Sequence, residues 1–462
     1  MRKRAGAGLG RMKSQIDVKP GEFNSTVKPA SRLGDPLEGA VKHDELPGPE
    51  TTAAMTMEDT MTNTTLASPL VKGISSAKLR VPQPAGGRKL PTDFRIASAD
   101  GHFETVGDVY YERFPDELKD KAPRYHSWDG MPIYIDPALD IPVVKLDDRT
   151  DTDLAEFVRD LVTAAVGEGA WDLERRIRDL DAEGLQKELM FPQTIVGIIR
   201  NPDRAVQEHV FRIYNEMLAE ACQRYPDRLY GVGICSNWWD PKKAHEAIAQ
   251  IVDLGLSTYM LPALSLGKTL EGEPISFGGA EMDAFWSEAA DAGLPVSFHT
   301  GENLALGGRN AAPASILVSF DPFRKPFGEI TFGGVLDRHP GLKFFFAEAG
   351  IAWVPPTLQL AEGLVDYHRT SFNYALQRRP SEYWHDNCAA SFMYDPIGLD
   401  HLDYIGVDNV MWSSDYPHNE STLGYGWDAM SLVVDQVGED AARKILGENC
   451  ISFFNMDDRP AS

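Results

Sequence analysis

Three side chains that can bind a metal ion stand two residues apart in the stretch Asp100-Gly-His102-Phe-Glu104. The residues before it, Ile96 to Ala99, are small and apolar and follow Pro91, which predicts a short strand that ends in this polar stretch. Side chains two apart on a strand point to the same face, so we expect the three to converge. Such a strand end is half of a metal site, although a polar surface turn explains the stretch equally well when it is taken alone.

Three later apolar runs of the sequence also end in a residue that can bind a metal ion. They end in His299, Glu348 and Asp415, and a small or turn residue follows each within two positions. A single histidine at a strand end is more often a capping or core residue. Together with Asp100 and His102, however, the set is better explained as one metal site, which could activate a bound water and move protons.

Two further residues near this set have open roles. His418 stands three residues beyond Asp415 and could reach a second metal ion, or it could serve as a hydrogen-bonding or substrate-facing residue. Glu104 could be a ligand, or it could orient His102. The number of candidate ligands is large enough for either one or two metal ions.

The elements that must position these residues alternate along the chain. We expect strands at 94–99, 188–192, 229–235, 256–261, 294–299, 342–348, 388–393 and 410–415. We expect helices at 171–183, 204–224, 241–252, 281–291, 322–338, 352–367 and 439–446. Continuous apolar runs suit parallel strands that are covered on both faces. Eight such units predict an α/β fold, a (β/α)8 TIM barrel, whose active site lies at the carboxyl ends of the strands. A doubly wound sheet is the alternative, but no Gly-x-Gly-x-x-Gly follows the first strand.

Residues 1–92 differ from the rest of the chain. They are rich in Gly, Pro, Ser, Thr and Met and contain one aromatic residue, Phe23. Such a segment cannot bury enough apolar surface to offset its ordering entropy, so we predict a disordered or extended N-terminal arm, with a strap around a neighbouring subunit as the alternative. The barrel should span 93–457. An insertion after its first strand, 103–170, should lie over the catalytic face as a partial lid.

Composition limits the partners and the compartment. The 462 residues include 45 Lys and Arg against 69 Asp and Glu, a formal charge of −24. This excess of negative charge argues against nucleic acid and anionic membranes as partners. No apolar run is long enough to span a membrane, and the basic N-terminus lacks the apolar core of a secretory signal. The four cysteines form no Cys-x-x-Cys pair, and we expect a reduced, cytoplasmic protein.

A set of short motifs resembles the amidohydrolase-related metal-dependent hydrolases, in the branch typified by aminocarboxymuconate-semialdehyde decarboxylase. The motifs are Ala99-Asp-Gly-His102, Leu180-Asp-Ala-Glu-Gly184, Tyr225-Pro-Asp-Arg-Leu229, Phe298-His-Thr-Gly301, Asp337-Arg-His-Pro-Gly-Leu-Lys343, Ala347-Glu-Ala-Gly350, Trp353-Val-Pro-Pro356 and Ser414-Asp-Tyr-Pro-His418. The resemblance implies a TIM barrel with a divalent metal, in an enzyme that is a hydrolase, a non-oxidative decarboxylase or a hydratase. Asp100 and His102 match the metal pair of the first strand, His299 the ligand of the fifth, and Asp415 the carboxylate of the eighth.

The sequence departs from the decarboxylases of this branch at two positions. The first strand has Asp-x-His where they have His-x-His, and Glu348 stands where several of them have a catalytic histidine. The candidate ligands are therefore rich in carboxylates. The family resemblance favours zinc, but two histidines with carboxylates also suit iron or manganese.

Three functions are compatible with these residues. The first is a metal-dependent hydrolase or decarboxylase of a small organic substrate, with Asp415, Glu348 and His299 as catalytic residues. The others are a dinuclear iron or manganese–iron oxygenase and a non-catalytic structural partner subunit. We favour the first, because the strand ends carry competent ligands. Arg309 and Asn310 could bind a substrate carboxylate, with a loop salt bridge as the alternative. We expect a homo-oligomer, with a hetero-oligomer as the alternative.

Overall fold

The computed structural model describes residues 82–83, 85–87, 90–128, 131–138, 141–142, 167–238, 240–263, 267–268, 272–301, 314, 317–318, 321–368, 376–418 and 421–457. The chain divides into two units. No residue of the first, Met1–Thr65, is described, and the second, Leu66–Ser462, contains every element below. Most of the predicted arm, 1–92, and both Arg309 and Asn310 lie outside the described residues.

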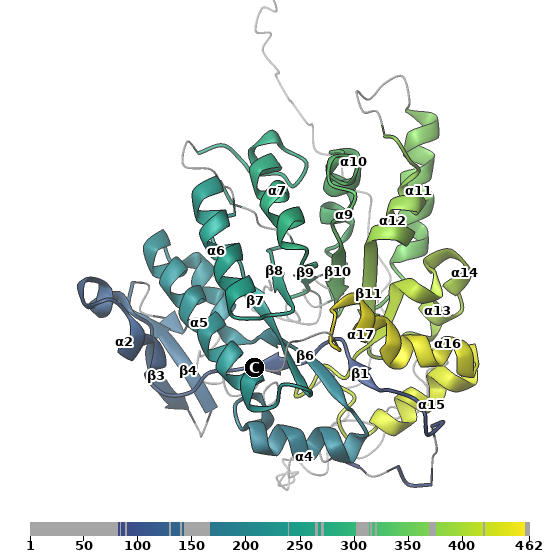
Figure 1. Cartoon of the computed structure of the whole chain (residues 1–462), viewed down its shortest axis with the longest axis horizontal. Coiled ribbons are helices and arrows are strands. Elements are labelled where there is room, and N and C mark those ends of the chain that lie inside the picture. Colours follow the sequence, from purple (N-terminus) through teal and green to yellow (C-terminus); the bar gives the residue numbers. More distant parts are fainter. Residues whose placement is uncertain are drawn as a thin grey trace, which may run out of the picture. The chain divides into compact units, whose positions relative to one another are not determined.

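Parallel strands form the barrel in the order in which they occur in the chain (Figure 1). They are β1 (Ala97–Ser98), β6 (Lys187–Pro192), β7 (Leu229–Ile234), β8 (Thr258–Met260), β9 (Val296–His299), β10 (Phe344–Ala347), β11 (Cys388–Phe392) and β12 (Val410–Trp412). A ninth strand, β2 (His102–Phe103), also pairs with β6. Each of the eight predicted strands is present, and the predicted TIM barrel is confirmed.

The first and last strands approach each other and close the ring. The backbone N–H of Ala99 donates to the carbonyl oxygen of Trp412 at 3.1 Å, and that of Asp415 donates to the carbonyl oxygen of Asp100, also at 3.1 Å. Gly101 divides β1 from β2, and a Cβ at this position would lie 2.5 Å from Oε1 of Glu188. A side chain at this position would therefore collide with the buried carboxylate of Glu188 in β6, which glycine avoids.

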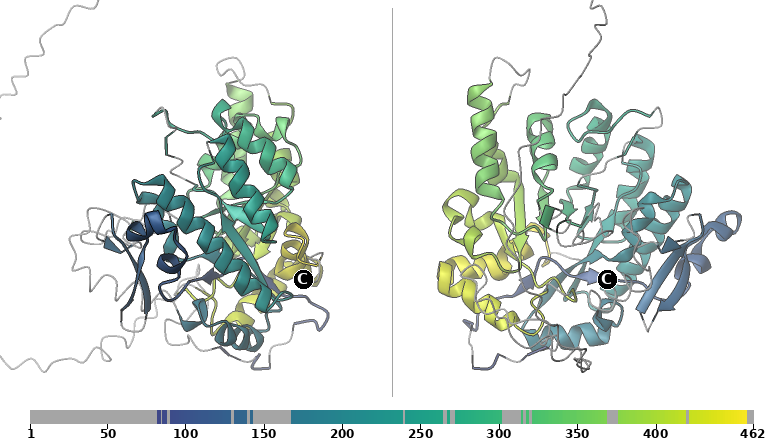
Figure 2. Two further views of the ribbon diagram at one scale, coloured as in Figure 1. Left: turned by 60° about the vertical axis from the view of Figure 1, so that its left-hand side comes forward. Right: turned by 180° about the vertical axis from the view of Figure 1, so that it is seen from behind.

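Helices cover the outside of the strands, as the views in Figures 1 and 2 show. They are α4 (Leu173–Glu183), α5 (Arg204–Arg224), α6 (Pro241–Asp253), α7 (Asp283–Ala292), α9 (Arg324–Phe332), α10 (Val335–Arg338), α11 (Val354–Tyr367), α12 (Pro380–Asn387), α13 (Pro396–Leu399), α14 (Leu402–Ile405), α15 (Gly426–Val437) and α16 (Glu439–Arg443). Helix α17 (Asn449–Phe453) instead packs against the core inside the barrel. The single helix predicted at 322–338 is two helices, because Gly334 between them has a left-handed φ of 66°. The predicted helix at 439–446 ends as α16 and continues as a π-helical turn, Lys444–Glu448.

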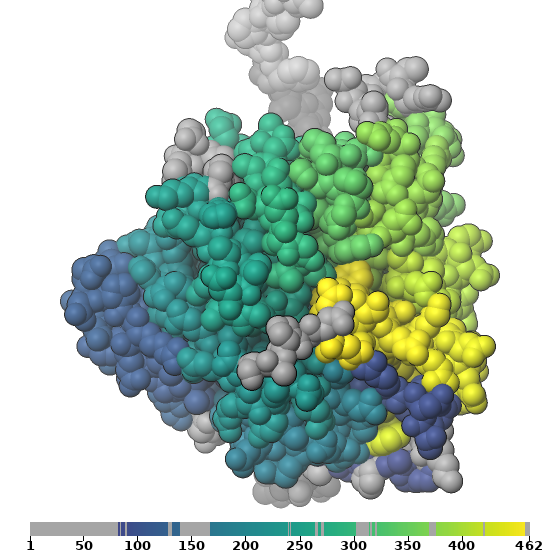
Figure 3. All heavy atoms as spheres, viewed as in Figure 1, coloured from purple at the N-terminus to yellow at the C-terminus, as the bar shows by residue number. Residues whose placement is uncertain are grey.

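The inside of the barrel is a small apolar core that is closed at one end by the C-terminal segment. Leu189, Tyr230 and Phe345 point into it, and Ile451 and Phe454 complete it. The Tyr230 hydroxyl donates to the carbonyl oxygen of Met456 at 2.6 Å. In Figure 3 the yellow C-terminal residues lie beside the purple start of the described chain. An ion pair between Arg95 and Asp457 joins these two segments. This end is therefore sealed, and the opposite end is left for a site.

The insertion after the first strand forms a small lobe beside the barrel (Figure 2). It contains α2 (Val109–Arg113), a 3₁₀ helix (Asp116–Lys121) and the antiparallel strands β3 (Arg124–Trp128), β4 (Met131–Asp136) and β5 (Ile141–Pro142). Its base is fixed by Thr105, whose hydroxyl lies 3.2 Å from that of Tyr110 and 3.0 Å from that of Tyr134. Residues 143–166 of the predicted insertion, and with them the test of the expected lid, lie outside the described residues. No helix of the described segments is long and apolar enough to cross a membrane.

Candidate metal centre

Six buried side chains meet at the carboxyl ends of the strands. Asp100, His102, His299 and Glu348 form one group of potential ligands, and Asp415 and His418 join His102 in a second. Each lies at or near the end of a strand. Asp100 lies between β1 and β2, His102 in β2, His299 at the end of β9 and Glu348 directly after β10, and Asp415 and His418 lie in the segment that follows β12. The convergence of these strand-end residues, predicted from the sequence, is thus present in the structure.

Two of these residues have a left-handed backbone conformation that residues other than glycine rarely adopt. Glu348 has a φ of 71° and Asp415 a φ of 55°. Left-handed conformations of residues other than glycine carry a cost and concentrate at functional sites. Glu348 comes directly after β10 and Asp415 three residues after the end of β12, and at each position the left-handed turn redirects the chain and its carboxylate.

The first group surrounds His299. Its Nε2 lies 3.5 Å from Oδ2 of Asp100, and its Nδ1 lies 3.5 Å from Oε2 of Glu348. The ring of His102 stands edge-on to that of His299, with the ring centres 5.0 Å apart. Nε2 of His102 is 3.8 Å from Oδ1 of Asp100. The two histidines and two carboxylates thus direct imidazole nitrogens and carboxylate oxygens towards one small volume.

The second group surrounds Asp415. Its Oδ1 lies 3.1 Å from Nε2 of His102 and 3.2 Å from Nδ1 of His418. The rings of His102 and His418 are stacked with their centres 3.8 Å apart. Nδ1 of His418 is also 3.8 Å from Oε1 of Glu348, so this histidine connects the two groups.

Several of these atoms are buried and make no hydrogen bond to a described residue. They are both carboxylate oxygens of Asp100, Nε2 of His102, Nε2 of His299 and Oδ1 of Asp415. Buried polar atoms are almost always hydrogen-bonded, so five such atoms in one cluster need an explanation. All five are atoms that can bind metal ions, and they belong to the two overlapping groups of potential ligands, so metal binding there would account for them.

The other nitrogen of each of two histidines is held by a carbonyl group. Nδ1 of His102 lies 3.2 Å from the carbonyl oxygen of Pro192, and Nδ1 of His299 lies 3.0 Å from that of Thr300. A carbonyl oxygen can only accept, so each Nδ1 carries the proton and each Nε2 faces the cluster. This arrangement orients metal-binding histidines in known metal sites, and the residues present therefore fit a metal ion.

Burial and neighbouring charges shift the pKa values of the cluster in different directions. Burial lowers the pKa of His102 to about 3, with help from His418. Burial also raises the pKa of Glu348 to about 8, and the charge of Asp415 adds to this rise. For His299, burial lowers the pKa, but the charges of Asp100 and Glu348 outweigh it and raise the value to about 9. Without a metal the cluster therefore holds protons.

The structure directs Glu104 away from this cluster. One of its oxygens accepts from the backbone N–H of Thr105 at 2.9 Å, and the other accepts from the N–H of Thr194 at 3.0 Å and from the Thr194 hydroxyl. The prediction of convergence with Asp100 and His102 assumed a strand that stays extended through Glu104. Strand β2 ends at Phe103, and Glu104 instead ties this turn to the segment after β6.

One residue near the cluster was missed by the sequence analysis. Gln193 follows β6 directly, and its Oε1 lies 2.8 Å from Nε2 of His418. It has the same position at a strand end as the predicted residues, so the same rule would have found it. The strand-end prediction included only histidines and carboxylates, which can bind a metal ion, and therefore omitted this neutral polar partner of His418.

The amino-acid sequence is similar to those of known proteins. Residues 187–456 match the amidohydrolase family. The gamma-resorcylate decarboxylase of Rhodococcus jostii (strain RHA1) is 24% identical over 314 residues, which cover 62% of this chain and 91% of that protein. The 2-amino-3-carboxymuconate-6-semialdehyde decarboxylase of Dictyostelium discoideum is 22% identical over 298 residues, which cover 63% of this chain and 79% of that protein.

Solved structures share the fold at low sequence identity. An amidohydrolase from Mycobacterium avium subsp. paratuberculosis K-10 superposes with a TM-score of 0.61 at 19% identity, over 79% of this chain and all of that one. The 5-carboxyvanillate decarboxylase of Novosphingobium aromaticivorans DSM 12444, complexed with manganese and 4-hydroxy-3-methoxy-5-nitrobenzoic acid, has a TM-score of 0.56 at 18% identity, over 82% of this chain and all of that one.

Proposed function

The chain belongs to the amidohydrolase family, and from this premise we propose that it is a metal-dependent carboxy-lyase that removes carbon dioxide from a small organic acid. The observation that carries the proposal is the cluster of buried oxygen and nitrogen atoms without hydrogen bonds at the carboxyl ends of the strands. A cluster of this kind, at the end of a TIM barrel where active sites are built, is suited to bind a cation and a substrate together.

Asp100, His102, His299 and Asp415 are the proposed metal ligands. Their Nε2 and carboxylate oxygens face one another and are buried. A bound divalent ion would polarise the substrate oxygens and reduce the cost of negative charge that develops when carbon dioxide leaves. Manganese, iron and zinc all accept such a mixed set of ligands, and a manganese-bound neighbour in the same fold makes manganese the first ion to test.

Glu348 is the proposed proton carrier. Decarboxylation breaks one carbon–carbon bond, releases carbon dioxide and leaves an electron pair on the carbon, which must take up one proton. Glu348 is 5% exposed and stands between His299 and His418, which are the groups through which a proton can be returned to its carboxylate. Asp415 contacts His102 and His418 and orients both rings. Gln193 would hold the far side of His418 in place.

The names of the known relatives favour decarboxylation over the other candidate reactions. Both relatives described above are decarboxylases, and their names describe aromatic or unsaturated acids. We therefore place the substrate among small acids of this kind. Hydrolysis remains the closest competing reaction, because the same ion could activate a water molecule. The oxygenase and the structural subunit have no such support. The binding of a substrate carboxylate by Arg309 and Asn310 stays a prediction, and so does a homo-oligomeric assembly.

The test is a product analysis with the manganese-loaded protein. The protein is incubated in heavy water with a panel of ortho-hydroxybenzoates and unsaturated carboxylic acids, and in parallel with amides and esters of the same acids. We expect carbon dioxide release from at least one acid, with one deuterium at the vacated carbon. Release of amine or alcohol from an amide or ester, without carbon dioxide from any acid, would instead identify a hydrolase.

A further inference from the structure

Helix α4 turns a charged face towards the barrel. Arg176, Asp179 and Glu183 are spaced three and four residues apart, so they lie on one side of the helix. They are 0%, 6% and 4% exposed. Helices on the outside of a barrel normally bury an apolar stripe, and buried charges are retained only when they are paired. The partners of these three residues should therefore reveal what the face does.

Arg176 binds the main chain of a proposed metal ligand. Its guanidinium donates to the carbonyl oxygens of His102 and Gly169, the latter at 2.8 Å, and to the carboxylate of Glu188 in β6. Both Arg176 and Glu188 are fully buried. The planar guanidinium has a fixed geometry, so three such bonds determine the position of the His102 backbone relative to β6.

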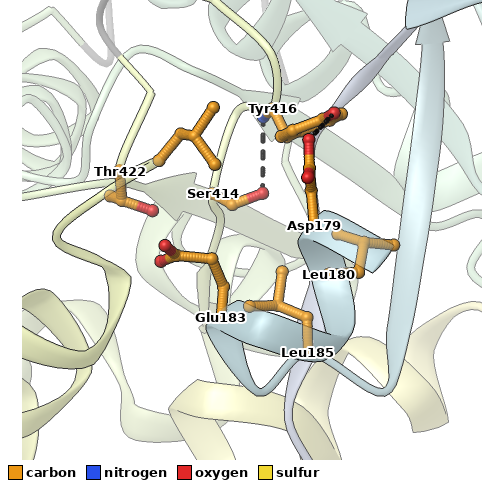
Figure 4. A pocket seen from close by; sticks show the side chains of 8 residues that line it. Asp179, Leu180, Glu183, Leu185, Ser414, Tyr416 and Thr422 are labelled. Carbon is orange, nitrogen blue, oxygen red and sulfur yellow. Dashed lines mark hydrogen bonds between the residues drawn. The ribbon is translucent and has the colours of Figure 1, made fainter. Parts of the chain in front are cut away.

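Asp179 binds the residue that follows another proposed ligand. The hydroxyl of Tyr416 donates to Oδ2 of Asp179 at 2.7 Å (Figure 4). The guanidinium of Arg176 lies over the Tyr416 ring, 5.0 Å from its centre. The N–H of Tyr416 donates to the Ser414 hydroxyl at 3.3 Å. Since Asp415 lies between these two residues in a left-handed conformation, the contacts of Tyr416 hold its backbone from one side.

Glu183 binds the loop beyond His418. Its two oxygens accept from the backbone N–H groups of Gly424 at 3.1 Å and Gly426 at 2.9 Å. Figure 4 shows Glu183, Asp179 and Tyr416 around one small cavity, which Ser414 also lines. The charged face of α4 therefore contacts, in turn, the segments that carry His102, Asp415 and His418.

From these contacts we propose that Arg176 is a positioning residue of the metal centre, and that Asp179 acts with it through Tyr416. The proposal rests on the metal site of the proposed function. Buried ion pairs are often less stabilising than apolar residues of the same volume, so stability alone is a weak reason for a fully buried Arg176–Glu188 pair. The Arg176–Glu188 pair instead has a positioning role: it helps to hold the backbones of His102 and Asp415, which are far apart in the sequence, at a fixed distance from each other.

Two sets of variants test this role on the full-length protein. The first is Tyr416→Phe, which removes only the hydroxyl that binds Asp179. The second is the double variant Arg176→Met with Glu188→Gln, which leaves no buried charge without its partner, and Arg176→Lys is the conservative comparison. The matched control is Arg228→Met. Arg228 also binds two carbonyl oxygens and one carboxylate, those of Gln186, Leu185 and Asp181, but it does not contact the site.

The measurements are the dissociation constant for cobalt(II), the visible absorption spectrum of the cobalt-loaded protein, and the melting temperature without metal. Substitution of residues that orient metal ligands typically weakens metal binding about 10–100-fold. We expect a loss of this size and a changed spectrum for Tyr416→Phe and the double variant, with partial recovery in Arg176→Lys. Arg228→Met should keep the affinity and spectrum of the wild type, whatever its melting temperature.

Two results would overturn the proposal, and they differ from a failure of the proposed reaction. Wild-type cobalt affinity and spectrum in a folded Tyr416→Phe protein would assign α4 a purely structural role. An equal loss of affinity in Arg228→Met would show that any local destabilisation weakens the site. If the wild type binds cobalt and these variants behave as expected while no acid is decarboxylated, the positioning role stands and the proposed reaction falls. A wild type that binds no cobalt would overturn both.

Discussion

Nε2 of His102 lies 3.1 Å from Oδ1 of Asp415, and neither atom makes a hydrogen bond to a described residue. The Nδ1 proton of His102 faces the carbonyl oxygen of Pro192, and burial keeps this ring neutral by lowering its pKa. A lone pair of the imidazole therefore faces a carboxylate oxygen. Two acceptors at this distance repel each other unless a proton or a metal ion lies between or beside them, and the imidazole and carboxylate donors gathered here suit a divalent metal.

Removal of a proposed ligand should release the metal without unfolding the barrel. In His299→Ala the site loses Nε2, which faces Asp100, while the apolar core below remains intact. We expect the metal dissociation constant to rise by more than the roughly 10–100-fold typical of residues that only orient ligands. Metal titration measures this, and circular dichroism provides the control for folding. A folded variant with wild-type metal affinity would exclude His299 from the ligands.

Substitution of the proposed proton carrier should separate chemistry from metal binding. Glu348→Gln keeps the volume of the side chain but cannot exchange a proton. General acid–base groups typically contribute about 10²- to 10⁴-fold to the rate, and we expect a loss of this order in kcat. Metal content decides its origin: full occupancy means a lost proton carrier, and reduced occupancy means a lost ligand. Full metal with a near-normal rate would remove Glu348 from the site.

Metal binding should depend steeply on pH. The pKa values of Glu348, raised to about 8, and of His299, raised to about 9, mean that the metal-free cluster binds protons at neutral pH. A metal ion must displace the proton from its proposed ligand His299, and its charge opposes protonation of His299 and favours the ionised form of the nearby Glu348, so its affinity should increase as the pH rises from 6 to 9. Calorimetry in two buffers of different ionisation enthalpy measures the protons released. An affinity that does not change over this interval would contradict the assignment of these residues to the metal site.

The sequence predicted the barrel because each buried strand is a continuous apolar run and each outer helix has a helical period. The predicted element boundaries were wrong where a single glycine or a short turn redirects the chain. Gly334 divides the helix expected at 322–338, and Gly101 divides the first strand into β1 and β2. Helices α12 and α15 were not predicted, although Pro380 and the acidic Glu382 stand in the first turn of α12.

The candidate site was predictable to the extent that its residues end strands. His299, Glu348 and Asp415 each follow an apolar run, and a parallel sheet places such ends at one edge. Glu104 was misplaced because the end of β2 at Phe103 depends on contacts with Thr105 and Thr194. The proposed role of Arg176 could not be foreseen, because an arginine inside an amphipathic helix looks like a solvent-facing residue until its partners in other elements are known.

The N-terminal arm should be dispensable for folding. A protein that begins at Val81 lacks the segment that is poor in aromatic and apolar residues but keeps the backbone N–H of Gln83, which donates to Glu183 at 2.8 Å. We therefore expect its melting temperature to lie close to that of the full chain. A fall of many degrees in differential scanning calorimetry would show that the removed residues pack on the barrel or on a partner subunit.

The most direct test of the metal centre is elemental analysis of the purified protein, coupled to activity before and after removal of the metal. We predict a tightly held divalent ion in a fixed ratio to the chain, loss of decarboxylation when a chelator removes it, and recovery when manganese, iron or zinc is returned. The measured ratio also distinguishes one ion from two in the overlapping groups that share His102. A metal-free protein that decarboxylates its substrate at the full rate would contradict the account.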